Sequence, residues 1–148
     1  MTAQGLTLHE RKTRRVNFRE EGFQFLGFAV SGRQGRNGRS YGHVEPSARS
    51  RQGLRDRLRQ ELQHWTLWRR VNDAVARVNR VLRGWAGYFH YPHSARVFGK
   101  MGWWMRDRWH RWLWRKHACR RALWTDYPDE KLHDFYGLWR LPGALRAA

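Results

Sequence analysis

The sequence predicts a mainly α-helical fold in which three helices follow a short β-hairpin. Apolar residues recur at helical spacing between residues 54 and 112, whereas they alternate with polar residues near the N-terminus. The chain has 148 residues, a usual length for one domain with its own core. We therefore expect one helical unit that carries the hairpin.

Residues 14–30 predict the hairpin. Val16 and Phe18 alternate with polar neighbours, the polar run 19–22 is typical of a turn, and residues 23–30 form an aromatic-rich second strand. An isolated hairpin is only marginally stable in water, so these strands need a sheet or helices to pack against. We expect the phenylalanines of the second strand to be partly exposed: Phe23, Phe25 and Phe28.

A linker rich in glycine and arginine is expected over residues 31–46. Its first ten residues include three glycines, three arginines and no apolar side chain. The glycines do not have the G-x-G-x-x-G spacing of a dinucleotide-binding turn. We interpret this stretch as a flexible, solvated basic loop, with contact to phosphate as the second reading.

The first helix is expected to begin at Ser47. Arg55 and Arg59 lie away from its apolar stripe, and the members of the stripe recur at helical spacing. The stripe comprises Leu54, Leu58, Leu62 and Trp65.

A second stripe predicts a second helix that ends at Arg83 and Gly84, where glycine can take the left-handed conformation of a helix cap. After so tight a turn we expect Trp85 and Phe89 to be buried, and Arg83 and Tyr88 to lie near the surface. The second stripe comprises Trp68, Val71, Ala74, Val75, Val78 and Leu82.

The third helix is expected to begin after the break at residues 91–94, with Ser94 as its N-cap, and to run toward Arg120. One face is interpreted as core: Phe98, Met101, Met105, Trp109 and Trp112. The opposite face carries Trp103 and Trp114 among polar residues, namely Arg106, Asp107, His110 and Arg111. These two tryptophans either face a partner or are buried against an element that this chain lacks.

The tail, residues 124–148, mixes acidic and apolar residues. Asp126, Asp129, Glu130 and Asp134 alternate with Leu132, Phe135, Leu138 and Trp139. This pattern predicts a loop and a short helix that dock onto the rest of the protein.

Charge points to a polyanionic partner. The chain has 30 Lys and Arg against 12 Asp and Glu, a formal charge of +18, and only four of the cations are lysines. Guanidinium groups match phosphates in a bidentate geometry, and so large a surplus repels itself in a compact fold. Nucleic acid is the leading partner class.

The sequence disfavours disulfide-bonded, metal-binding, hydrolytic and membrane-spanning proteins. A single cysteine, Cys119, excludes intramolecular disulfides and cysteine-rich zinc sites, and the histidines at 90, 93, 110 and 117 do not form an H-E-x-x-H motif. No serine lies in a G-x-S-x-G motif. The acids Asp129, Glu130 and Asp134 are interpreted as salt-bridged, or as lying near a helix N-terminus, where acids are favoured, rather than as a general acid/base pair. No apolar run is long enough for a membrane span or a signal peptide, so we expect a cytoplasmic protein without a membrane partner.

Several strings together resemble one family. Residues 8–16 (LHERKTRRV) and 23–28 (FQFLGF) resemble the end of the palm of group II intron reverse transcriptases. Residues 46–47 (PS), residues 78–89 (VNRVLRGWAGYF) and the aromatic helix that follows resemble the thumb, or maturase-specific X domain, of the same proteins. Gly87 stands where the family commonly has Asn, and Arg80 where it often has Pro.

The resemblance implies a domain organisation. Residues 1–30 are a palm remnant, 31–46 the linker, 47–123 a three-helix thumb-like maturase domain and 124–148 the tail. The palm-derived elements are Lys12 and Thr13, with Lys12 at the position of a lysine that assists proton transfer, and the primer-grip residues Phe25, Leu26, Gly27 and Phe28.

Catalysis is not expected from this chain alone. Polymerases of the family hold two metal ions with aspartates, but this chain has no Asp-Asp pair and its first aspartate is Asp56. The resemblance therefore implies no catalytic or metal-binding residue and no cofactor, since Mg²⁺ belongs to an intact reverse transcriptase.

The implied function is binding of structured RNA, that of a group II intron, to assist its folding and splicing. Two alternatives stay open: the chain completes a reverse transcriptase whose palm is a second, upstream polypeptide, or it is a decayed remnant. The expected RNA-binding residues are Arg55, Arg59, Arg83, Tyr88, Trp103, Arg106, Arg111, Trp114 and Arg115.

Overall fold

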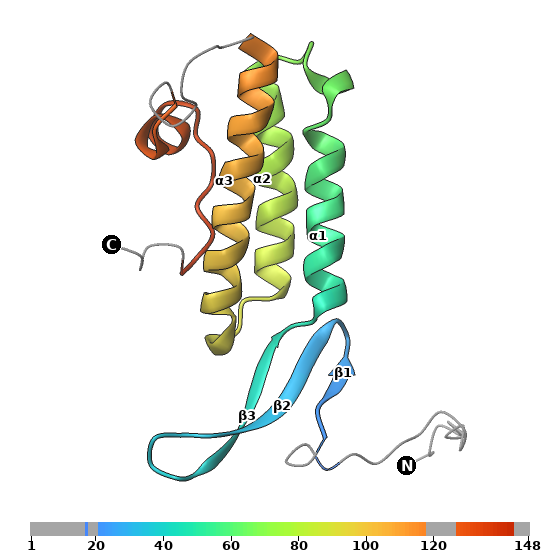
Figure 1. Ribbon diagram of the computed structural model, residues 1–148, viewed down its shortest axis with the longest axis vertical. Coiled ribbons are helices and arrows are strands. Elements are labelled where there is room, and N and C mark those ends of the chain that lie inside the picture. Colours follow the sequence, from blue (N-terminus) through green and yellow to red (C-terminus); the bar gives the residue numbers. More distant parts are fainter. Residues whose placement is uncertain (1–16, 18–20, 118–126, 144–148) are drawn as a thin grey trace, which may run out of the picture.

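Three helices stand side by side above a small sheet (Figure 1) in the computed structural model, which describes residues 17, 21–117 and 127–143. The helices are α1 (Ala48–Glu61), α2 (Val71–Tyr88) and α3 (Ala95–His117). The sheet is antiparallel and has the order β1 (Phe23–Phe25), β2 (Phe28–Gln34) and β3 (Ser40–Pro46). The predicted mainly helical fold with three helices is confirmed.

The linker expected over residues 31–46 is wrong in its conformation, because these residues complete β2 and form β3. Val30 pairs with Val44, and Gln34 pairs with Ser40 at the far end of the ladder. The turn between them contains Gly38 with a φ of 72°. Backbone hydrogen bonds form this ladder, and its far part, where Ser31 to Gln34 pair with Ser40 to His43, carries mostly polar side chains and glycines, so the polar run did not reveal it.

The hairpin predicted over residues 14–30 differs in its turn. β1 pairs with β2, and the turn lies at Leu26 and Gly27, after Phe25 rather than before Phe23. The first predicted strand, apart from Asn17, lies outside the described residues. Phe25 is largely exposed and Phe28 is half-buried, so partial exposure of the phenylalanines is confirmed.

Gly27 joins the sheet to α1. Its carbonyl accepts hydrogen bonds from the backbone N–H of Ser47 at 2.8 Å and from the hydroxyl of Ser50 at 2.7 Å. Its φ is +83°, and a Cβ at this position would lie 2.9 Å from the Ser50 hydroxyl, so only glycine fits. On the neighbouring surface the ring of Phe28 packs edge-on against Phe89 at 4.9 Å.

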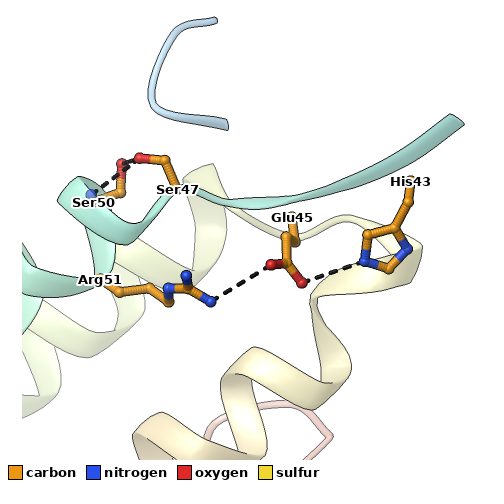
Figure 2. Close-up of polar contacts among 5 residues, drawn as sticks. All are labelled: His43, Glu45, Ser47, Ser50 and Arg51. Atoms are coloured by element: carbon orange, nitrogen blue, oxygen red, sulfur yellow. Dashed lines mark hydrogen bonds and ion pairs between the residues drawn. The ribbon is translucent and has the colours of Figure 1, made fainter. Parts of the chain in front are cut away.

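Helix α1 begins where the sequence predicts. Ser47 is its N-cap and its side chain accepts a hydrogen bond from the Ser50 N–H at 3.2 Å (Figure 2). The expected core residues Leu54, Leu58 and Leu62 are buried. Trp65 is a correction: α1 ends at Glu61, and the 3₁₀ helix η1 (His64–Thr66) that follows turns Thr66 inward and leaves Trp65 exposed.

The predicted end of the second helix at Gly84 is wrong. Helix α2 continues through Gly84 and Gly87 to the C-cap Phe89, because Ala86 and Phe89 extend the apolar stripe and are buried. This burial outweighs a cost of about 1 kcal/mol for each helical glycine. The prediction that Trp68 belongs to the apolar stripe of this helix is also wrong, since Trp68 precedes α2 and is exposed to solvent.

The core face of α3 is confirmed. The five expected residues, Phe98, Met101, Met105, Trp109 and Trp112, are buried, and Trp103 and Trp114 are exposed. The prediction that His110 lies on the polar face is wrong, because His110 is buried. Ser94 closes the 3₁₀ helix η2 (Pro92–Ser94) directly before α3, but its buried hydroxyl has no hydrogen-bond partner and does not cap the helix.

The tail docks against the bundle, as predicted, in its described part (Figure 1). It contains the π-helix η3 (Lys131–Phe135), and Leu132, Leu138 and Leu141 enter the core. The side chain of Asn79 holds this segment, because its amide donates to the carbonyl of Gly137 at 2.8 Å and accepts from the N–H of Trp139 at 2.8 Å.

Candidate nucleic-acid interface

A basic groove runs between the lower parts of α1 and α3. Cationic residues line it together with the amide of Gln52, and its lining contains no carboxylate. Its apolar part consists of Ala48, Val97 and Met101. The cations are Arg49, Arg51, Arg55 and Lys100.

One edge of this groove is fixed by Glu45 on β3. Figure 2 shows its carboxylate between Arg51, at 3.5 Å, and Nε2 of His43, at 3.3 Å. Because β3 leads directly into α1, this ion pair fixes the direction in which Arg51 points. The groove therefore has a defined end at the sheet.

Trp104 of α3 forms the middle of the same face. Arg55 lies over its ring at 5.9 Å and Arg59 at 5.6 Å, both from α1. Arg59 is also paired with Asp56 at 2.6 Å. Stacking on an indole face holds guanidinium groups in one orientation while their N–H groups stay available to an acceptor.

Like charges accumulate at the upper part of this face, around Arg108. Burial and the neighbouring Arg115, Arg59 and Arg111 lower the pKa of Arg108 from its usual value, against a smaller opposing effect of Asp107. Nε of Arg108 is buried and has no hydrogen-bond partner. A guanidinium stays charged in proteins, so these like charges repel one another.

Two exposed tryptophans lie along α3 on the side opposite its core face. Trp103 is 59% exposed and Trp114 is 47% exposed. With 1.5 Å of rise per residue they are about 16 Å apart along the helix and on the same side. Between them Arg111 is paired with Asp107 at 3.1 Å. Helix α3 thus offers two flat aromatic surfaces, roughly a quarter turn around the helix from the cations near Arg108.

Residues 51–127 match the family described as "Group II intron, maturase-specific domain". This range is more than half of the chain and includes all of α2 and α3. The chain belongs to this family. The domain is the maturase-specific region of a reverse-transcriptase-family protein. No curated protein and no solved structure matches the chain.

Four of the nine expected RNA-binding residues lie together on one face of the domain, here called the α1–α3 face. From α1 come Arg55 and Arg59, and from α3 come Arg111 and Arg115. Trp103 and Trp114 are exposed on the side of α3 opposite its core face. The sequence reasoning missed four further cations, Arg49, Arg51, Lys100 and Arg108. The spacing of 51, 55 and 59, and of 100, 104, 108, 111 and 115, is the signal that reveals all of them except Arg49.

The remaining three expected residues lie elsewhere. Arg106 forms an ion pair with Asp129 and thereby holds the tail. The hydroxyl of Tyr88 donates to the carbonyl of Leu26 at 3.0 Å, so Tyr88 holds the turn between β1 and β2. Arg83 is exposed on α2, away from the α1–α3 face.

The palm-derived elements are described only in part. Lys12 and Thr13 lie outside the described residues, and Phe25 and Leu26 are 63% and 67% exposed at the tip of the sheet. Across the described ranges no group of three His, Cys, Asp or Glu side chains is arranged to hold a metal ion. No helix in the described part of the chain is long and apolar enough to cross a membrane.

Proposed function

We propose that this maturase-specific domain binds structured RNA of a group II intron on its α1–α3 face and assists the folding and splicing of that RNA. The gathering of Arg59, Arg108, Arg111 and Arg115 around one point carries this proposal. The carboxylates within this cluster, Asp56 and Asp107, are each paired with an arginine of their own helix. Phosphates are the anions that relieve the remaining repulsion.

RNA duplexes are recognised through their shape, their phosphates and their 2′-hydroxyls. An ordered row of guanidinium groups between two helices suits this mode because it contacts successive phosphates without reading bases. Trp103 and Trp114 add surfaces on which unpaired bases of loops or bulges stack. Neutralised phosphates repel one another less, so distant parts of the intron approach more closely.

An RNA titration at one fixed salt concentration tests the binding. The variant Arg108→Gln/Arg111→Gln/Arg115→Gln removes three charges from the α1–α3 face. The control Arg33→Gln/Arg36→Gln/Arg39→Gln removes three exposed charges from the hairpin of β2 and β3. We expect the first variant to lose at least tenfold in affinity for a group II intron RNA and the control to lose much less. An equal loss in both contradicts a localised site.

A splicing assay tests the assistance. Self-splicing of the intron RNA is followed at a Mg²⁺ concentration too low for the RNA alone. We expect the wild-type protein and the hairpin control to restore splicing, and the α3 variant to fail at concentrations that saturate the wild type. Restoration by the α3 variant at those concentrations contradicts the proposal.

A further inference from the structure

A second surface with aromatic and basic side chains lies at the start of α2. A groove there is lined by Trp68, Arg69, Asp73, Ala76, Arg77 and Arg80. Trp68 is 80% exposed, the highest value among the large apolar side chains in the described part of the chain. None of these residues belongs to the α1–α3 face.

The exposure of Trp68 is built into the fold. Nζ of Lys116 donates to the carbonyl of Leu67 at 2.6 Å and to the carbonyl of Arg69 at 2.7 Å, and so holds the backbone on both sides of Trp68. Arg69 is paired with Glu61 at 3.1 Å and lies over the Trp68 ring at 5.8 Å. The indole is thus held in water by a fixed connection between η1 and α2.

The groove has the chemistry of a nucleotide site. Arg77 and Arg80 are exposed on successive turns of α2, and one carboxylate, Asp73, lies beside them. The remaining positive charge suits a phosphate, and the free indole face suits a base. A base inside a duplex has no free face, so the ligand that fits is an unpaired nucleotide.

We propose that the Trp68 groove binds a single-stranded RNA segment, with one unpaired base stacked on Trp68 and its phosphate on Arg77 and Arg80. The domain then contacts RNA at two places, with structured RNA on the α1–α3 face and an unpaired segment on α2. This second site goes beyond the proposed function and does not depend on it, because its residues are different.

Two fluorescein-labelled probes separate the sites: an oligoadenylate of eight nucleotides and an RNA hairpin with a long stem. Their dissociation constants are measured by fluorescence anisotropy for the wild type, Trp68→Ala and Trp65→Ala. Trp65 is the matched control because it is an exposed tryptophan of the same connection that does not line the groove. Thermal melting checks that each variant is folded.

We expect Trp68→Ala to weaken oligoadenylate binding about tenfold and to change hairpin binding less than twofold. Trp68→Phe retains part of the affinity, Arg77→Gln/Arg80→Gln weakens oligoadenylate binding as well, and Trp65→Ala changes neither probe. The variant Arg108→Gln/Arg111→Gln/Arg115→Gln is expected to weaken binding of the RNA hairpin, so a failure of the α1–α3 site is seen separately from a failure of the Trp68 site. Unchanged oligoadenylate binding by Trp68→Ala, an equal loss for both probes, or an equal effect of Trp65→Ala overturns the second site.

Discussion

The indole Nε1 of Trp112 donates a hydrogen bond of 2.9 Å to the hydroxyl of Thr66, and both side chains are fully buried. Thr66 in turn donates to the carbonyl of Gln63 at 2.7 Å. This chain of bonds ties the connection after α1 to the C-terminal part of α3. It therefore sets the position of the segment that carries Trp65 and Trp68.

Replacing Thr66 by Val is expected to lower the free energy of unfolding by about 1–3 kcal/mol. Valine has a similar shape, but it leaves the Trp112 N–H without a partner in the core, while the Gln63 carbonyl keeps only the hydrogen bond from the Thr66 backbone N–H. Urea denaturation measures the change. The control Thr66→Ser keeps the hydroxyl and is expected to lose less. Equal stability of the Val and Ser variants contradicts a role for the hydrogen bond.

Gly27→Ala is expected to loosen the sheet from the bundle. The new Cβ would lie 2.9 Å from the Ser50 hydroxyl oxygen, and the alanine would have to keep the left-handed φ of Gly27. Gly38→Ala is the matched control, because Gly38 also has a positive φ but faces open space. We expect about 1–2 kcal/mol of backbone strain in the control and a larger loss at Gly27. Hydrogen exchange of the β2 and β3 amides tests this, and equal effects of the two substitutions contradict it.

Asn79 offers a test of tail docking. Asn79→Ala removes both hydrogen bonds to the tail, whereas Asn79→Asp keeps an acceptor for the Trp139 N–H and loses the donor to Gly137. We expect the Trp139 amide to lose protection from hydrogen exchange in the Ala variant and to keep it in the Asp variant. The cost of the Ala variant is about 0.5–1.5 kcal/mol for each bond lost. Full protection of the Trp139 amide in the Ala variant would contradict the proposal that Asn79 holds the tail.

The substitutions Phe89→Ala and Trp85→Ala compare the cost of removing a fully buried aromatic side chain with that of removing a half-buried one. Phe89 is buried and contacts the sheet through Phe28, whereas Trp85 is half-buried between α1 and α2. We expect Phe89→Ala to cost about 3–5 kcal/mol and Trp85→Ala to cost less. Thermal unfolding of the two variants measures the order, and a larger cost for Trp85→Ala reverses this reading.

The helical core was predictable from the sequence because its signal is local. Leu54, Leu58 and Leu62 repeat at helical spacing, and Ser47 has the side chain that an N-cap needs. The fate of Trp65 and Trp68 was not predictable in this way. The first apolar stripe extends to Trp65 and the second begins at Trp68, but α1 ends at Glu61 and α2 begins at Val71. Both tryptophans therefore lie in the connection between the helices, which is held by the buried contact of Thr66 with Trp112.

The strand β3 shows a different limit. Much of its pairing with β2 joins polar residues and glycines through backbone hydrogen bonds, which leave little trace in hydrophobic patterning. The dipeptide Asn37-Gly38 is a strong hairpin signal and marks the turn in retrospect. Arg106 and Tyr88 show a third limit, since their partners Asp129 and Leu26 are distant in sequence.

The dependence of RNA affinity on salt tests the central claim most directly. With about six phosphates contacted, the logarithm of the binding constant should fall with the logarithm of the salt concentration at a slope of roughly −4 to −5. Removing Arg108, Arg111 and Arg115 should make the slope shallower by about two to three units, and the control with Arg33, Arg36 and Arg39 replaced should keep it. The same slope for the wild type and both variants contradicts an RNA site on the α1–α3 face.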